Sequence, residues 1–141
     1  MKIKHLILTG SLFALFVLPA CNKYEDGPAV SLRTKKERVA NIWQIENAYR
    51  NGENVTEDYD EFTLLLRKDG DAELAALYSA GDFTLEYETQ GTWEFANDKE
   101  NLSMDFENDD ADRTYQILRL KEDELWLREI GGEDELHLMP R

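Results

Sequence analysis

Apolar and polar residues alternate with a period of two through most of the chain beyond residue 41, for example in the runs 62–66, 83–87, 93–95 and 102–106. This alternation gives a strand one buried and one solvated face, as in an antiparallel sheet. Turn-forming Gly, Asn and Asp residues separate the runs, as at 51–52, 68–70 and 131–132. The pattern predicts about nine strands, over 42–50, 61–68, 71–78, 83–88, 91–96, 101–106, 113–120, 124–130 and 134–139.

A short helix precedes these strands in the prediction. It spans 32–40, with Ser31 as its N-cap and a small apolar face from Val30, Leu32 and Val39. No helical pattern separates the strands, which indicates an antiparallel up-and-down meander. An open meander exposes its edges, whereas closure gives a barrel with room for side chains or one small ligand. The expected fold is therefore all-β, an up-and-down barrel of about 8–9 strands after one short N-terminal helix.

The first twenty residues do not fit this pattern. A short basic start at 2–5, a mostly apolar run at 6–18 and small residues before Cys21 have the layout of a secretory signal peptide. The apolar run is shorter than the ~20 residues of a membrane span. We expect 1–20 to be a signal peptide, 21–30 a polar tether and 31–141 the β domain.

Cys21 is the single cysteine of the chain, which excludes an intrachain disulfide. A catalytic thiolate would need a positioned base, and a plain buried cysteine is the remaining alternative. The sequence Leu18-Pro19-Ala20-Cys21 resembles the bacterial lipobox. That resemblance implies that Cys21 is acylated and becomes the new N-terminus, and two or more acyl chains anchor a protein stably to a membrane.

The residues after Cys21 indicate the membrane to which the protein is sorted. Asn22 differs from the aspartate of the inner-membrane retention signal known in enterobacteria. The stretch 23–26, Lys-Tyr-Glu-Asp, resembles the short acidic export signal of Bacteroidota lipoproteins. The resemblance implies an outer-membrane lipoprotein that is exposed at the cell surface.

The 121 residues beyond position 20 carry a net charge of −16. Such a surface repels phosphate backbones and anionic lipid, so we expect no nucleic-acid partner and a membrane attachment that depends on the acyl anchor. The only basic cluster in this part of the chain is 33–38. We expect a solvated helix face there; the alternative is a contact with lipid headgroups or lipopolysaccharide phosphates near the anchor.

Candidate catalytic and metal-binding residues are few. His137 is the one histidine beyond the signal peptide, and the alternation places it on the outer face of the last strand. A triad with Ser31, Ser79 or Ser103 is the alternative, but no catalytic or nucleotide-binding motif accompanies it. The acidic run 105–112 could suit calcium but lacks the EF-hand glycine and terminal glutamate, so a solvated loop is expected. We predict a protein that is not an enzyme and has no metal or cofactor.

Three stretches point to a family. The strand that opens with Trp43, the middle strand 91–95 and the late hairpin 115–127 resemble those of the lipocalin-like lipoproteins of Bacteroidota, over roughly residues 30–140. Lipocalins open with Gly-x-Trp, and this chain has Asn41 in place of the glycine. The resemblance implies a lipocalin-like barrel in which an arginine, Arg119 or Arg128, packs on Trp43.

The late hairpin can be registered around a turn at 121–124. The expected pairs are Leu120 with Leu125, Leu118 with Leu127, Arg119 with Trp126 and Ile117 with Arg128. This register offers an alternative for Arg119, which then covers Trp126 on the outside of the barrel.

Two functions fit this reading. The first is a lipid-anchored envelope protein whose barrel binds or carries a small apolar or amphipathic ligand. Its expected ligand-binding interior consists of Trp43, Phe62, Leu64, Phe83, Leu85, Trp93, Phe95, Met104 and Phe106. The alternative is a filled barrel that supports an envelope protein partner, because a small domain needs those same side chains for its core. Candidate contacts for that partner are Leu65, Leu77, Trp126 and Met139.

Overall fold

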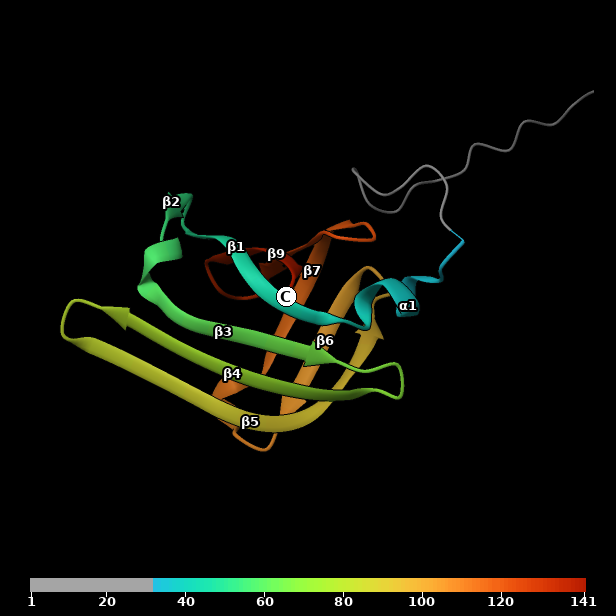
Figure 1. The fold of residues 1–141 in the computed structure, drawn as a ribbon, viewed down its shortest axis with the longest axis horizontal. Coiled ribbons are helices and arrows are strands. Elements are labelled where there is room, and N and C mark those ends of the chain that lie inside the picture. The colour runs from blue at the N-terminus through green and yellow to red at the C-terminus, as the bar shows by residue number, and fades with distance from the viewer. Residues whose placement is uncertain (1–31) are drawn as a thin grey trace, which may run out of the picture.

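Nine antiparallel strands form one sheet that closes on itself (Figure 1). The computed structural model describes residues 32–141. The strands follow one another in the order of the chain, and β1 pairs with β9 to complete an eight-stranded barrel to which β2 is added at one edge. Their bounds are β1 Ile42–Arg50, β2 Glu53–Asn54, β3 Tyr59–Leu66, β4 Asp71–Ala80, β5 Phe83–Ala96, β6 Asn101–Phe106, β7 Arg113–Leu120, β8 Leu125–Glu129 and β9 Asp134–Pro140. The predicted all-β, closed up-and-down barrel is confirmed.

The strands predicted at 83–88 and 91–96 are in fact one strand, β5. Gly91 lies in its middle and pairs with Phe106 of β6. A Cβ at this position would lie 2.0 Å from the backbone oxygen of Asp105. The glycine therefore marks a close approach of two backbones inside a strand, not a turn between two strands.

The helix is shorter than predicted. α1 spans Lys35–Val39, and Thr34 is its N-cap, in a capping box with Glu37. Ser31, the expected N-cap, lies outside the described residues, and Leu32, expected on the apolar face, is fully exposed. No helix among residues 32–141 is long and apolar enough to cross a membrane.

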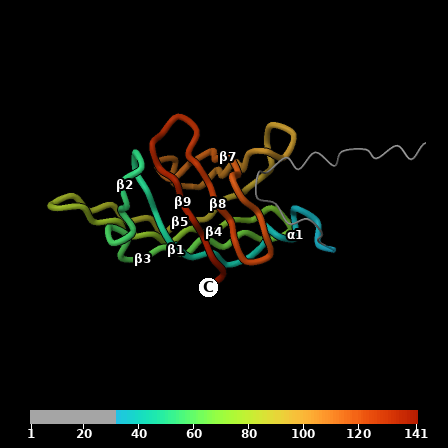
Figure 2. The backbone as a smooth tube through the Cα atoms, turned by 90° about the horizontal axis from the view of Figure 1, so that it is seen from above, coloured from blue at the N-terminus to red at the C-terminus, as the bar shows by residue number. Residues whose placement is uncertain are grey.

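α1 lies at one end of the barrel, which we call the closed end, beside the β3–β4 and β7–β8 turns (Figures 1 and 2). Two tryptophans fix this end. The indole nitrogen of Trp43 donates to the Val39 carbonyl and that of Trp93 to the Arg67 carbonyl, both at 2.8 Å. Arg38 of α1 is buried here, and its Nη1 donates to the Leu120 carbonyl at 3.2 Å.

The core continues from these tryptophans along the inner faces of the strands. Its largest fully buried aliphatic side chains are Leu64, Leu66, Leu102, Leu120, Leu125, Leu127 and Leu138. Fully burying one such side chain stabilises the fold by ~1.5–3 kcal/mol. Leucines from five of the eight barrel strands, β3, β6, β7, β8 and β9, thus meet in one cluster and hold the barrel shut.

The late hairpin confirms two of the four predicted pairs, Leu120 with Leu125 and Arg119 with Trp126. A register shift between Ile117 and Arg119 places Ile117 opposite Leu127, so the pairs predicted for Ile117 and Leu118 are wrong. The extra residue at a β-bulge causes such a shift.

Neither Arg119 nor Arg128 packs on Trp43, although the family resemblance implied this for one of them. The Arg119 guanidinium lies 3.8 Å from the ring centre of Trp126, on the outside of the barrel, and Arg128 pairs with Glu135. At the closed end the Trp43 indole N–H donates instead to the Val39 carbonyl of α1, and Arg38 of the same helix donates to the Leu120 carbonyl.

Candidate functional site

The open end of the barrel, opposite α1, holds a cavity of about 160 Å³ that we call the cup. Tyr78, Phe83 and Leu85 of β4 and β5 contribute to its lining, and the β4–β5 hairpin extends past the other strands at this end (Figures 1 and 2). Fourteen residues line the cup: Arg50, Tyr59, Phe62, Leu74, Ala76, Tyr78, Phe83, Leu85, Tyr87, Ala111, Arg113, Tyr115, Asp134 and Leu136.

Below the cup the barrel is almost filled. The adjoining cavity measures about 30 Å³ and is lined by side chains that include Leu64, Met104 and Phe106. That is little more than the space of one water molecule. A small ligand therefore has room at the open end and none in the lower interior.

Three of the nine side chains expected to bind ligand, Phe62, Phe83 and Leu85, line the cup. Leu64, Met104, Phe106 and again Phe62 line the small cavity beneath it. Trp43, Trp93 and Phe95 line neither cavity, because they pack at the closed end, where the Trp93 and Phe95 rings meet edge to face with centroids 5.4 Å apart.

Phe83 does not lie inside the barrel as expected. It is 58% exposed, because β5 begins beyond the rim formed by the neighbouring strands. Its ring contacts Tyr78 of β4 with centroids 6.5 Å apart, and Tyr78 contacts Tyr59 at 5.1 Å. The hairpin thus presents an aromatic wall to one side of the cup.

A polar network that the sequence pattern did not predict also lines the cup and includes the hydroxyl of Tyr78. Arg50 donates from Nε and Nη2 to the two carboxylate oxygens of Asp134, and from Nη1 to the Tyr78 hydroxyl at 2.6 Å. The Tyr78 hydroxyl donates to Asp58 at 3.3 Å. The hydrogen bonds to Asp134 raise the pKa of the Arg50 guanidinium above its ordinary value, so Arg50 is charged at any relevant pH.

A second arginine, Arg113, joins the lining from the start of β7. Its Nε lies 3.0 Å from a carboxylate oxygen of Glu129. Its Nη1 donates to the backbone carbonyls of Asp110 at 3.0 Å and Asp112 at 2.6 Å. Both arginines of the cup are therefore neutralised by carboxylates.

Two tyrosine hydroxyls complete the site. Tyr59 and Tyr115 line the cup, and burial raises the pKa of both phenols above the ordinary value, so both stay protonated. No described residue forms a hydrogen bond with either hydroxyl. These groups can donate to or accept from a molecule in the cup.

The acidic run at 105–112 forms a structured turn beside the cup. It contains the 3₁₀ helix η2, Asp109–Ala111, capped by the Asn108 side chain. Asp112 accepts the Phe106 backbone N–H at 2.7 Å, and Tyr87 donates to the Asp110 carbonyl. Within residues 32–141, no three His, Cys, Asp or Glu side chains are grouped closely enough to hold a metal ion.

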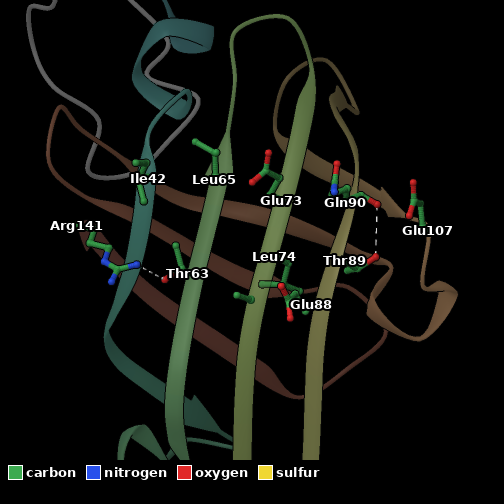
Figure 3. A pocket seen from close by; sticks show the side chains of 11 residues that line it. Ile42, Thr63, Leu65, Glu73, Leu74, Glu88, Thr89, Gln90, Glu107 and Arg141 are labelled. Carbon is green, nitrogen blue, oxygen red and sulfur yellow. Dashed lines mark hydrogen bonds between the residues drawn. The ribbon is translucent and has the colours of Figure 1, made fainter.

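A second hollow, larger than the cup, lies outside the barrel, on the outer face of β1, β3, β4 and β5 (Figure 3). This outer groove measures about 600 Å³, with Ile42 and Leu65 on one side and the carboxylates Glu73, Glu88 and Glu107 on the other. Arg141 at one edge donates to the Thr63 hydroxyl at 3.0 Å.

The side chains proposed to contact a protein partner are spread over different strands. Leu65 and Leu77 are half-buried, and Met139 is 36% exposed. Trp126 is covered on both faces, by the Arg119 guanidinium and by the His137 ring, which stacks on it at 3.9 Å and 4°. Both faces of the Trp126 ring are thus occupied by neighbouring side chains of the same domain.

His137 lies on the outer face of β9, as the alternation predicted. Its Nε2 is 2.9 Å from a carboxylate oxygen of Glu135. Burial by itself would raise the pKa of Glu135, but hydrogen bonds from His137 and Arg128 outweigh it and lower that pKa below the ordinary value. The histidine therefore belongs to a hydrogen-bonded row of side chains on the outer face, with Glu135 and Arg128, and does not line the cup.

Two comparisons bear on this fold. Residues 40–127 match the family model described as a lipocalin-like domain. A lipocalin-like protein from Bacteroides uniformis, known from a crystal structure, superposes with a TM-score of 0.50 and 16% sequence identity, over 74% of this chain and 99% of that chain. At this identity the likeness concerns the fold alone. None of the curated proteins matches this chain.

Proposed function

Because the chain belongs to the lipocalin-like domain family, we propose that it is a binding protein, and not an enzyme, that holds one small amphipathic ligand in the cup. The observation that carries this proposal is the cup itself, a cavity of about 160 Å³ in an otherwise filled barrel. A cavity of ~150 Å³ lined by apolar side chains accepts benzene. One ring or a short branched chain therefore enters, and the rest of the ligand stays at the rim.

The lining favours an amphipathic molecule over a purely apolar one. Phe62, Leu74 and Leu85 offer apolar surface, whereas the Tyr59 and Tyr115 hydroxyls offer hydrogen bonds in the same cavity. Burying one ring of about 150 Å² at about 25 cal/mol per Å² gives about 4 kcal/mol. The loss of translational and rotational freedom on association opposes this gain, so the ring alone binds more weakly than ~1 mM and contacts at the rim must add affinity.

Binding can be tested with 2-phenylethanol, an uncharged molecule with one ring and one hydroxyl, in a ¹H–¹⁵N NMR titration. We expect saturable shifts at the open end, around Leu85 and Tyr115. Leu85→Trp fills the cup and should weaken binding at least about tenfold, since the ring loses its space. Leu77→Trp, the same change on the outer face of β4, is the matched control. Equal binding by both variants would place the site elsewhere.

The anchor is part of the same proposal. Cys21, in the lipobox-like sequence Leu18-Pro19-Ala20-Cys21, carries the acyl chains and holds the protein at the outer membrane. Cys21→Ala should then yield a protein that leaves the membrane fraction and takes up no labelled fatty acid. A Cys21→Ala protein that still fractionates with membranes and still incorporates the label would refute the anchor.

A second candidate function is support of an envelope protein partner, which the filled lower barrel and the outer groove favour. It predicts that Leu65→Glu disturbs an envelope complex and that Leu85→Trp leaves it intact. Site-specific photo-crosslinking from position 42, in the same groove, measures the complex in intact cells that carry each variant. A complex that responds only to Leu85→Trp would support the cup instead.

A further inference from the structure

The two ends of the barrel differ sharply in charge. The four loops around the cup, 50–60, 80–83, 107–113 and 129–134, contain twelve carboxylates and two arginines. We call these loops the acidic collar. The turns and terminal segments at the closed end, 33–41, 67–71, 97–100, 121–124 and 141, contain eight carboxylates and nine cations. Most of the domain's net negative charge is therefore at or near its open end.

The two collar arginines do not provide a site for an anion. Arg50 directs Nε and Nη2 at Asp134 and Nη1 at the Tyr78 hydroxyl, so all three of its nitrogens are engaged. Arg113 directs Nε at Glu129 and Nη1 at two backbone carbonyls. A carboxylate or phosphate binds best to a free pair of guanidinium N–H groups. Arg50 offers that pair only by losing contacts with Asp134 or Tyr78, and Arg113 only by losing the hydrogen bonds from Nη1 to the two carbonyls.

The unpaired charges of the collar are all negative. Glu57, Asp60, Asp82 and Asp109 make no ion pair with any lysine or arginine among residues 32–141. Loops of one sign around a low-dielectric cavity focus the field into it and raise the local concentration of ions of opposite charge.

The cup also offers direct contacts for a positive group. Four tyrosines, Tyr59, Tyr78, Tyr87 and Tyr115, line it, and aromatic rings attract ammonium and guanidinium groups. The structure already contains one example, since the Arg50 guanidinium lies 4.9 Å from the ring centre of Tyr78. The hydroxyls of Tyr59 and Tyr115 can accept hydrogen bonds from an ammonium group.

We propose that the cup selects amphipathic cations, molecules that carry a ring or short chain into the cavity and an amine at the acidic collar. This inference rests on the proposed ligand-binding function and adds the chemical class of the ligand. The apolar part of the ligand provides the contact area in the cavity. The collar discriminates by charge among ligands that share the same apolar part.

The test compares three molecules with the same ring and different heads: 2-phenylethylammonium, 2-phenylethanol and 3-phenylpropionate. In NMR titrations at low salt we expect the cation to bind tightest and the carboxylate weakest, with a ratio of about tenfold or more between them. The ratio should shrink at ~0.5 M salt, because salt screens the collar. Equal binding of all three, or tightest binding of the carboxylate, would overturn the charge selection and leave the cup as a site. Binding of none would overturn the proposed function itself.

A matched pair of variants locates the source of the selection. The triple variant Glu57→Gln, Asp82→Asn, Asp109→Asn removes three collar charges, and the cation-to-carboxylate ratio should fall several-fold. The triple variant Glu46→Gln, Glu94→Gln, Asp105→Asn removes the same charge from exposed strand positions outside the collar. Its ratio should stay close to that of the wild type. Equal changes in both variants would assign the selection to overall charge and refute the role of the collar.

Discussion

Arg50 and Asp134 face each other across the seam that closes the barrel. They are Cα partners in the β1–β9 register, 84 positions apart in the chain. The Arg50 Nε and Nη2 atoms lie 2.8 and 3.0 Å from the two carboxylate oxygens of Asp134. The same pair that joins the first strand to the last therefore also forms part of the cup.

The first prediction concerns the strength of this pair. A double-mutant cycle with Arg50→Met and Asp134→Asn should give a coupling free energy of about 1 kcal/mol, at the upper end for partly exposed pairs, because the contact is bidentate and Asp134 is only 21% exposed. Arg67 and Glu73, 45% and 44% exposed on the outer surface, are the control pair, with less than about 0.5 kcal/mol expected. Urea denaturation of the four proteins in each cycle measures the two coupling free energies. A larger coupling for the control pair would contradict the prediction.

The second prediction tests the assignment of faces in β5. Trp93 is 5% exposed and its indole N–H is bonded to the Arg67 carbonyl, so Trp93→Ala should lower the free energy of unfolding by ~3–5 kcal/mol. The neighbouring Glu94 is exposed, and Glu94→Ala should cost less than about 0.5 kcal/mol. Urea melts of the two variants side by side give the comparison, and equal midpoints would be inconsistent with it.

The third prediction concerns the close approach at Gly91. A Cβ there would meet the Asp105 oxygen at 2.0 Å and the Phe106 Cα at 2.6 Å, and both atoms are backbone. Gly91→Ala should therefore destabilise the domain by about 1–3 kcal/mol, as overpacking does. Thr92→Ala, at the next and exposed position, is the control and should have little effect. Thermal unfolding monitored by circular dichroism suffices, and a Gly91→Ala protein as stable as wild type would show that the two strands can separate.

The fourth prediction is a pH dependence at the capping box of α1. The pKa of Glu37 falls from 4.5 to about 2, chiefly through the backbone N–H of Thr34 and then through Lys68. A carboxyl whose pKa is lower in the folded state stabilises the fold above its unfolded pKa and loses that contribution as the pH falls toward its folded pKa. The advantage of wild type over Glu37→Gln should thus be full above about pH 5 and shrink between about pH 4.5 and 2. Urea midpoints across this range measure it, and a constant difference would contradict the assignment.

Much of the fold follows from the alternation of residue types. Period-two patterning predicts strands because it is the only arrangement that gives each strand one dry face. The pairing of Arg119 with Trp126 follows from the position of a single turn. The family was also within reach, because the strand opening with Trp43 and the late hairpin carry its pattern over most of the domain.

The cup was harder to predict, because it depends on β-bulges. Register shifts lie between Ile45 and Asn47 in β1 and between Tyr59 and Glu61 in β3. Each shift exchanges the inner and outer faces for the residues that follow or precede it. Strict alternation from Trp43 would place Arg50 outside, whereas the bulge turns it into the cup. No residue type in those strands announces the extra residue, so the polar half of the site stayed hidden in the sequence.

The position of α1 bears on the side from which a ligand reaches the cup. The described chain enters the domain beside α1 at the closed end, and the cup opens at the opposite end (Figures 1 and 2). A domain held through an acylated Cys21 would therefore be attached at the end opposite its cup. That point of attachment would leave the mouth of the cup open to a ligand from the surrounding water.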